Sequence, residues 1–265
     1  VWDHAGLIGA RQGPTLMNKR EMPGAQFFPE STLNFAENCL AHARGVDDIA
    51  IIAHQESGGR QIISWGQLRA AVGNLRHQLI RLGVKPHDVV AGFVSHGPEA
   101  IIGALATLSI GAIWTSCSPD FGVQGVVDRF GQTQPKVLIA AQHTRYNKKT
   151  IDLTERVAQL LEAIPSFTAC ILFGQADPNA TVGRAGCQIV DWLDATAGHH
   201  PLEFSATSFN HPAFILYSSG TTGVPKCIVH GHGGSLIQLV KEHRYHVDIQ
   251  PGDRVLYFTT CGWMM

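Results

Sequence analysis

Apolar positions at helical spacing alternate with short, wholly apolar runs along most of the chain. After Ser64, leucine, valine and alanine recur every three or four residues, which predicts a helix that ends at Gly83. The run 89–94 that follows is wholly apolar, as in a strand buried on both faces. The same alternation predicts helices at 98–110, 123–130 and 149–163, and strands at 112–114, 137–140, 169–173, 213–216 and 227–229. Strand–helix–strand order at this spacing predicts the α/β class, with parallel sheets flanked by helices.

The two ends of the chain and one connection follow other patterns. Ser31 and Thr32 are typical helix caps, and they precede Leu33, Ala36, Leu40 and Ala43 on one helical face. The runs 49–53 and 61–63, separated by a glycine-rich turn, indicate a hairpin. Residues 174–210 are rich in turn formers, so we expect loops with one short strand at 188–190. We also expect an apolar strand shortly before Trp263.

Composition narrows the classes of function. The 265 residues are 45% hydrophobic, enough for a substantial core, and the net charge of −1 indicates neither a nucleic-acid partner nor an anionic membrane. The longest apolar run, Ala100–Trp114, is shorter than the ~20 residues of a membrane span. Six widely separated cysteines indicate reduced thiols in the cytoplasm rather than disulfides. The His230/His232 and His243/His246 pairs lack further ligands at metal-site spacing, so no metal site is predicted.

Candidate chemistry is concentrated between the last two predicted strands. The stretch holds four hydroxyl residues, two glycines and one lysine: Ser218, Ser219, Gly220, Thr221, Thr222, Gly223 and Lys226. The glycines allow successive N–H groups to face one anion, the hydroxyls add donors, and the lysine adds charge. This combination predicts a loop that binds the phosphates of a nucleotide triphosphate. It is not a Walker A loop, because Val224 and Pro225 precede the lysine. An ordinary surface turn is the alternative.

This loop, Tyr217–Lys226, resembles the phosphate-binding loop of the adenylate-forming superfamily, which includes acyl-CoA synthetases, peptide-synthetase adenylation domains and luciferases. The segment Phe28–Asn38 resembles the N-terminal segment of the acetyl-CoA-synthetase branch. Four further stretches resemble the acetoacetyl-CoA synthetases more than acetyl- or propionyl-CoA synthetases: 111–122, 126–130, 225–230 and 261–265. The resemblance implies an N-terminal segment over 1–48 and a large AMP-binding domain, truncated at its C-terminus, over 49–265.

The resemblance also implies a two-step acid–thiol ligase reaction. The carboxylate of acetoacetate attacks ATP, which is bound with Mg²⁺, to form an acyl-adenylate and release diphosphate. The thiol of coenzyme A then displaces AMP. Two alternatives stay open: a ligase for another short-chain or branched acid, and a truncated, non-catalytic module that binds a nucleotide or a partner.

The remaining residue assignments also come from the resemblance. Arg129 would lie near the nucleotide phosphate of coenzyme A, with a surface ion pair to Asp128 or Asp120 as the alternative. Three residues would begin the acyl pocket, unless they only fill the core: Trp263, Met264 and Met265. Ser116, Ser118 and Asp120 match the family without an assignable role. No catalytic residue is assigned, because the family's catalytic lysine is expected beyond Met265, and we therefore expect the chain alone to be inactive.

Overall fold

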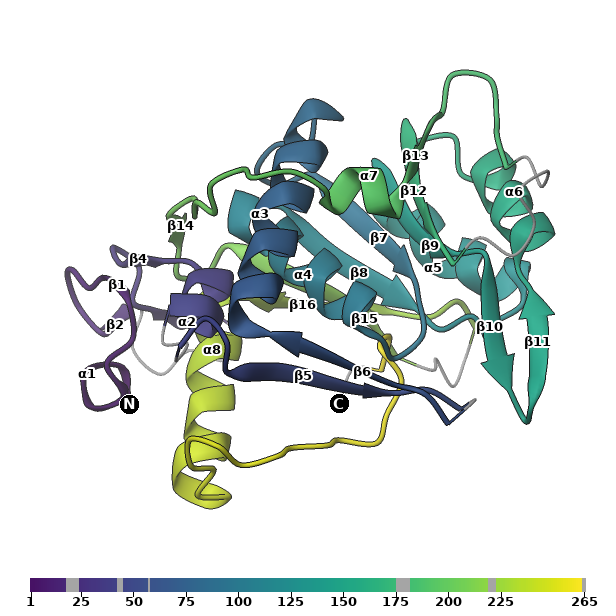
Figure 1. The fold of residues 1–265 in the computed structure, drawn as a ribbon. Coiled ribbons are helices and arrows are strands. Elements are labelled where there is room, and N and C mark those ends of the chain that lie inside the picture. Colours follow the sequence, from purple (N-terminus) through teal and green to yellow (C-terminus); the bar gives the residue numbers. More distant parts are fainter. Residues whose placement is uncertain (18–23, 42–44, 57, 175–181, 219–222, 264–265) are drawn as a thin grey trace.

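A seven-stranded sheet forms the centre of the protein (Figure 1). The computed structural model describes residues 1–17, 24–41, 45–56, 58–174, 182–218 and 223–263. In spatial order the strands are β13 (Gln188–Asp191), β12 (Ala169–Phe173), β9 (Val137–Ala141), β7 (Val89–Phe93), β8 (Ile113–Cys117), β15 (Pro212–Tyr217) and β16 (Cys227–Gly231). Every neighbouring pair is parallel except β15 and β16, which are antiparallel. The predicted α/β class is confirmed.

Helices cover both faces of this sheet, because successive strand side chains point to opposite sides. Val90 and Ile139 pack in one core with helices α2 (Phe35–Ala41), α3 (Trp65–Arg81), α4 (Pro98–Ile110) and α8 (His232–Lys241). Ala91 and Leu138 face a second core, formed with α5 (Val123–Thr133) and α6 (Thr154–Ala163). The wholly apolar strands of the sequence are therefore the strands buried on both faces.

The order of the strands creates a topological switch point at one edge of the sheet. The chain leaves β7 through α4 to reach β8 on one side, and then crosses through α5 to β9 on the other side of β7. In open parallel sheets, ligands bind beyond the carboxyl ends of the strands where connections diverge in this way. We call this region, beyond the carboxyl ends of β7, β8, β9 and β15, the carboxyl edge.

The N-terminal part packs against the same core, with its own small sheet. Strand β4 (Thr32–Leu33) pairs with β1 (Gly9–Ala10) and with β14 (Thr207–Ser208). The predicted cap of α2 at Ser31 and Thr32 is wrong. Asn34 caps the helix instead, since its Oδ1 accepts from the N–H groups of Ala36 and Glu37. Its Nδ2 donates to the carbonyls of Leu108 and Ser205, which attaches this segment to the domain.

Several other elements differ from the prediction. The helix expected over 149–163 begins only at Thr154, because Lys149–Asp152 forms strand β11 in a hairpin with β10 (His143–Tyr146). The connection 174–210 contains the predicted strand as β13, and also a short helix, α7 (Trp192–Thr196), that the sequence reading missed. Helix α8 was also missed. The hairpin of β5 (Ile49–His54) and β6 (Arg60–Ser64) is confirmed.

The segment before Trp263 is not a strand. Residues 253–258 form no regular secondary structure and lack any strand partner among the described residues, although 255–258 are apolar. Leu256 is 86% exposed and Phe258 is 98% exposed. An apolar run without a neighbour to complete its backbone hydrogen bonds does not form a strand.

A buried histidine joins α8 to α2. His232 opens α8, and its Nδ1 accepts a hydrogen bond from the backbone N–H of Phe35 at 3.1 Å. Its ring lies next to that of His211, with centroids 5.5 Å apart. An accepting Nδ1 carries no proton, so the ring is neutral. Burial, reinforced by repulsion from His211, lowers the pKa of His232 to about 3.

Apolar helices in the described part of the chain are all too short to cross a membrane.

Candidate functional site

The predicted phosphate-binding loop leaves the sheet at its carboxyl edge through two segments, which we call its legs: residues 217–218 are the first leg and residues 225–227 are the second. Strand β15 ends at Tyr217, which pairs with Cys227 at the start of β16. Beyond this pair, the N–H of Ser218 donates to the carbonyl of Lys226 at 3.1 Å and closes the legs. Gly223 has a φ of 139°, a conformation that favours glycine. Four predicted loop residues lie outside the described part of the chain: Ser219, Gly220, Thr221 and Thr222.

The first leg is anchored by the buried side chain of Tyr217. Its hydroxyl lies 2.8 Å from Oγ1 of Thr115 and 3.4 Å from Oγ1 of Thr133. Oγ1 of Thr115 also lies 2.7 Å from the carbonyl of Ile215. Because a threonine hydroxyl has one proton and a carbonyl only accepts, Tyr217 donates to Thr115. Burial raises the pKa of Tyr217 well above its usual value, so this donor stays protonated.

The second leg is attached to helix α5. Pro225 is buried, and its carbonyl accepts a hydrogen bond from Nε2 of Gln132 at 2.8 Å. The thiol of Cys227 donates to Oε1 of the same glutamine at 3.6 Å. The side chain of Lys226, between these two residues, is exposed. A fixed backbone with an exposed ammonium suits contact with a ligand that arrives from solvent.

Arg129 also lies on α5, one turn before Gln132. Its guanidinium sits over the ring of Phe121, 4.3 Å from the centroid, and 6.0 Å from the centroid of Tyr217. One of its N–H groups donates to the carbonyl of Gly125 at 2.6 Å. The alternative of an ion pair with Asp128 or Asp120 is not formed. Among the described residues Arg129 has no carboxylate within ion-pair distance, so its charge remains available to an anion.

The two carboxylates considered as partners of Arg129 have other roles. Asp120 accepts from the hydroxyl of Ser118 at 2.8 Å, in the turn that leads into α5. Asp128 accepts from the amide of Gln124 at 2.7 Å on the same helix. Ser118 and Asp120 therefore shape the backbone before α5.

Residues 261–263 pass across the carboxyl edge next to β8 and β15. The buried hydroxyl of Ser116 donates to the carbonyl of Cys261 at 2.7 Å, and Trp263 pairs with Tyr217 in a parallel bridge. A Cβ on Gly262 would lie 2.6 Å from the carbonyl oxygen of Ser116, so glycine is required for this approach. Trp263 is 53% exposed at the edge. Met264 and Met265 lie outside the described residues.

The structure therefore gathers Ser218, Lys226, Arg129 and Trp263 from three separate segments at one edge of the sheet. It also gives a role to three residues that had none from sequence: Gln132 was not singled out at all, while Tyr217 and Ser116 were noted only as parts of family-like stretches. Gln132 and Tyr217 hold the two legs, and Ser116 holds the segment that carries Trp263. Each acts through a contact distant in sequence, which no local motif reveals.

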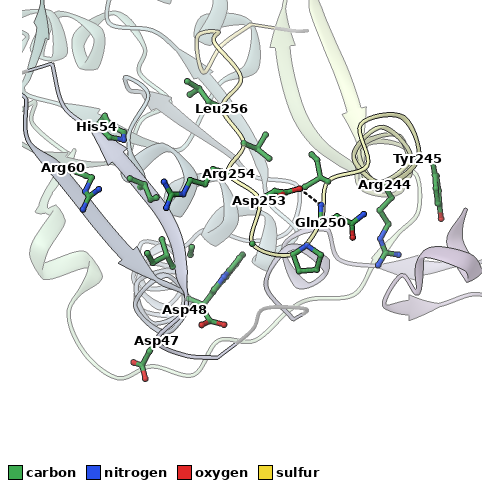
Figure 2. Close-up of a pocket in the computed structure, with 18 of the residues that line it drawn as sticks. Asp47, Asp48, His54, Arg60, Arg244, Tyr245, Gln250, Asp253, Arg254 and Leu256 are labelled. Carbon is green, nitrogen blue, oxygen red and sulfur yellow. Dashed lines mark hydrogen bonds between the residues drawn. The ribbon is translucent and has the colours of Figure 1, made fainter.

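A wide groove lies elsewhere, between the β5–β6 hairpin and residues 249–256 (Figure 2). Figure 2 shows Asp48, His54 and Arg60 on the hairpin side and Asp253, Arg254 and Leu256 on the other. Neither leg of the loop lines this groove, nor does Arg129. The groove is lined by both acidic and basic side chains, and Val255 and Leu256 of the exposed apolar segment form part of one wall. It is therefore separate from the candidate phosphate site.

Comparison with known proteins shows which enzyme family this chain belongs to. The family model described as AMP-binding enzyme matches residues 38–265, so the chain belongs to the AMP-binding enzyme family. Within it, the chain is 43% identical to acetoacetyl-coenzyme A synthetase of Rhizobium meliloti (strain 1021) and 38% identical to malonamoyl-CoA synthetase of Penicillium aethiopicum. Both matches cover 100% of this chain, and they cover 40% and 38% of those proteins.

A solved structure agrees with these sequence matches. Acetoacetyl-CoA synthetase from Streptomyces lividans superposes on 99% of this chain with a TM-score of 0.90 and 37% sequence identity, and 40% of that chain is covered. The resemblance to the adenylate-forming superfamily and to acetoacetyl-CoA synthetases is confirmed. The chain spans about two fifths of the length of these relatives.

Proposed function

We propose that the protein is an acid–thiol ligase that activates acetoacetate with ATP and transfers the acyl group to coenzyme A. The observation that carries this proposal is the similarity to acetoacetyl-CoA synthetases over the full chain, at 43% identity. The first step joins a carboxylate oxygen to the α-phosphorus of MgATP and releases diphosphate. In the second step the thiol of coenzyme A attacks the acyl carbonyl and AMP leaves.

The loop from Ser218 to Lys226 binds the β- and γ-phosphates in this proposal. The residues assigned to it are Ser218, Ser219, Gly220, Thr221, Thr222, Gly223 and Lys226. The carboxyl-edge position of its legs and the exposed ammonium of Lys226 support the assignment. Its part in the reaction is positioning and charge neutralisation, with no covalent step.

Arg129 binds a phosphate of coenzyme A in this proposal. Arg129 is only half-buried and has no carboxylate partner among the described residues, which supports this. Trp263, Met264 and Met265 begin the acyl pocket, supported by the place of Trp263 at the carboxyl edge next to Tyr217. The six free cysteines support a reducing compartment, and we propose the cytoplasm. The division at residue 48 and the inactivity of this chain alone stay predictions.

A second acid is favoured by one specific relative. Malonamoyl-CoA synthetase of Penicillium aethiopicum is 38% identical over the whole chain. A malonamoyl group has an amino group where an acetoacetyl group has a methyl, and the two are otherwise the same size and shape. The alternative substrate is therefore another short acid with a carbonyl at its third carbon.

Acid-dependent exchange of diphosphate into ATP, measured on the whole protein, tests the proposal. The panel is acetoacetate, malonamate, 3-hydroxybutyrate, propionate and acetate. We expect kcat/KM for acetoacetate to exceed that for acetate at least about tenfold, since the 3-oxo group adds a polar contact. In the full reaction, Arg129→Gln should raise KM for coenzyme A and leave the exchange unchanged.

Two outcomes would contradict the proposal. Preference for acetate or propionate would reassign the substrate. Binding of ATP without exchange for any acid would favour the non-catalytic module.

A further inference from the structure

Lys226 is the one fixed positive charge in the candidate phosphate loop, and its backbone is held on both sides. The carbonyl of Pro225, in the peptide group before it, accepts from Gln132 at 2.8 Å. Its own carbonyl, in the peptide group after it, accepts from Ser218 at 3.1 Å. Peptide groups are planar, so two anchored planes leave little freedom at the Cα between them. The direction in which the lysine side chain leaves the backbone is therefore set by these two bonds.

The amide of Gln132 is fully used in this arrangement. One Nε2 proton goes to the carbonyl of Asp128 at 2.6 Å, one turn back on α5, and the other goes to Pro225. Its Oε1 accepts from the thiol of Cys227 at 3.6 Å. Burial raises the pKa of Cys227, which keeps the thiol protonated as a donor. Turning the amide over would place its oxygen against two carbonyl oxygens, so this orientation is the only one that satisfies all three groups.

We propose that Gln132 is a positioning residue, which aims the ammonium of Lys226 at the polyphosphate by fixing the peptide group before it. This inference rests on the proposed function of the loop. Gln132 touches no substrate itself and acts only through Lys226. Since α5 also carries Arg129, one helix supports both the proposed ATP and coenzyme A contacts.

Calorimetric titration of the whole protein with MgATP, in the absence of any acid, tests this inference. The variant Gln132→Met keeps an unbranched side chain and removes all three polar contacts. The matched control is Gln124→Met, on the same helix, where the lost amide contacts Asp128 and no other side chain among the described residues. We expect Gln132→Met to raise Kd for MgATP about two- to tenfold, the range set by one ordinary hydrogen bond. The control should stay within about twofold, and cooperative thermal unfolding should show that both variants remain folded.

A double-mutant cycle separates positioning from a general structural role. If Gln132 acts through Lys226, then Gln132→Met has no further effect on Kd once Lys226 is replaced by alanine. Full additivity of the two changes would overturn the inference, as would an unchanged Kd for Gln132→Met.

The outcome for the parent protein distinguishes this inference from the proposed function. A parent that binds no MgATP would overturn the phosphate-loop assignment, and the role of Gln132 with it. A parent that binds MgATP while Gln132→Met binds equally well would overturn only the role of Gln132.

Discussion

Two apolar runs of similar composition differ in burial: one is a buried strand and the other is exposed to solvent. Residues 89–93 form β7, the central strand of the large sheet, with β8 on one side and β9 on the other. Residues 255–258 are as apolar, yet they are exposed, form no regular secondary structure and have no strand partner among the described residues. Phe93 is 1% exposed and Phe258 is 98% exposed. Hydrophobicity is common to both runs, and the difference between them is whether neighbouring strands complete their backbone hydrogen bonds.

The strongest test of this comparison is to truncate one phenylalanine in each run. Phe93→Ala in the 1–265 chain should lower the free energy of unfolding by about 3–5 kcal/mol, because it empties a volume in the core formed with α5 and α6. Phe258→Ala is the matched control and should change it by less than about 0.5 kcal/mol. Urea unfolding followed by circular dichroism measures both. Equal losses would show that residues 255–258 are packed in solution.

The pH dependence of stability sharpens the comparison for the packed part of the molecule. His232 has a folded-state pKa of about 3, below its ordinary value of 6.5, so the unfolded chain binds the extra proton first. Stability from this group is complete above pH 6.5 and is lost as the pH falls toward 3. Between pH 6.5 and 5 the loss should approach 2 kcal/mol, at about 1.4 kcal/mol per pH unit.

The variant His232→Gln checks the source of that loss. Glutamine retains an oxygen that can accept from the N–H of Phe35, but it does not titrate. The difference in unfolding free energy between pH 7 and pH 5 should therefore shrink in the variant. An undiminished difference would assign the acid sensitivity to other groups.

The smallest expected effect concerns the boundary between the two regions. Ser116→Ala removes the hydrogen bond to the carbonyl of Cys261, and should cost about 1 kcal/mol. Because this bond ties residues 261–263 to β8, amide hydrogen exchange there should become faster while exchange within β8 stays unchanged. Faster exchange throughout β8 would instead mean that Ser116 supports the strand itself.

Much of the fold could be predicted from local patterns. The central strands are short apolar runs separated by helices of regular spacing, and this was enough for the α/β class. The errors fall where tertiary contacts outweigh local propensity. Asn34 rather than Ser31 caps α2, because its amide is also held by two distant carbonyls. Residues 149–152 join a hairpin because β10 lies beside them.

The candidate site divides in the same way. The loop residues and Lys226 could be predicted, because their chemistry is contiguous in sequence. The residues that hold the loop could not be predicted. Gln132 lies 93 positions from Pro225, and Thr115 lies 102 positions from Tyr217. Such pairs meet only after the sheet has formed.

The sequence by itself determined which segments are apolar enough to be buried, and where the glycine, hydroxyl and lysine groups of the loop occur. Only the tertiary structure decided which apolar run became a strand and which side chains anchor Lys226. It also decided that Arg129 on α5 has no carboxylate partner among the described residues. The physical reason is that burial and hydrogen bonding are relations between two groups. A linear pattern specifies one partner of each pair, and the fold supplies the other.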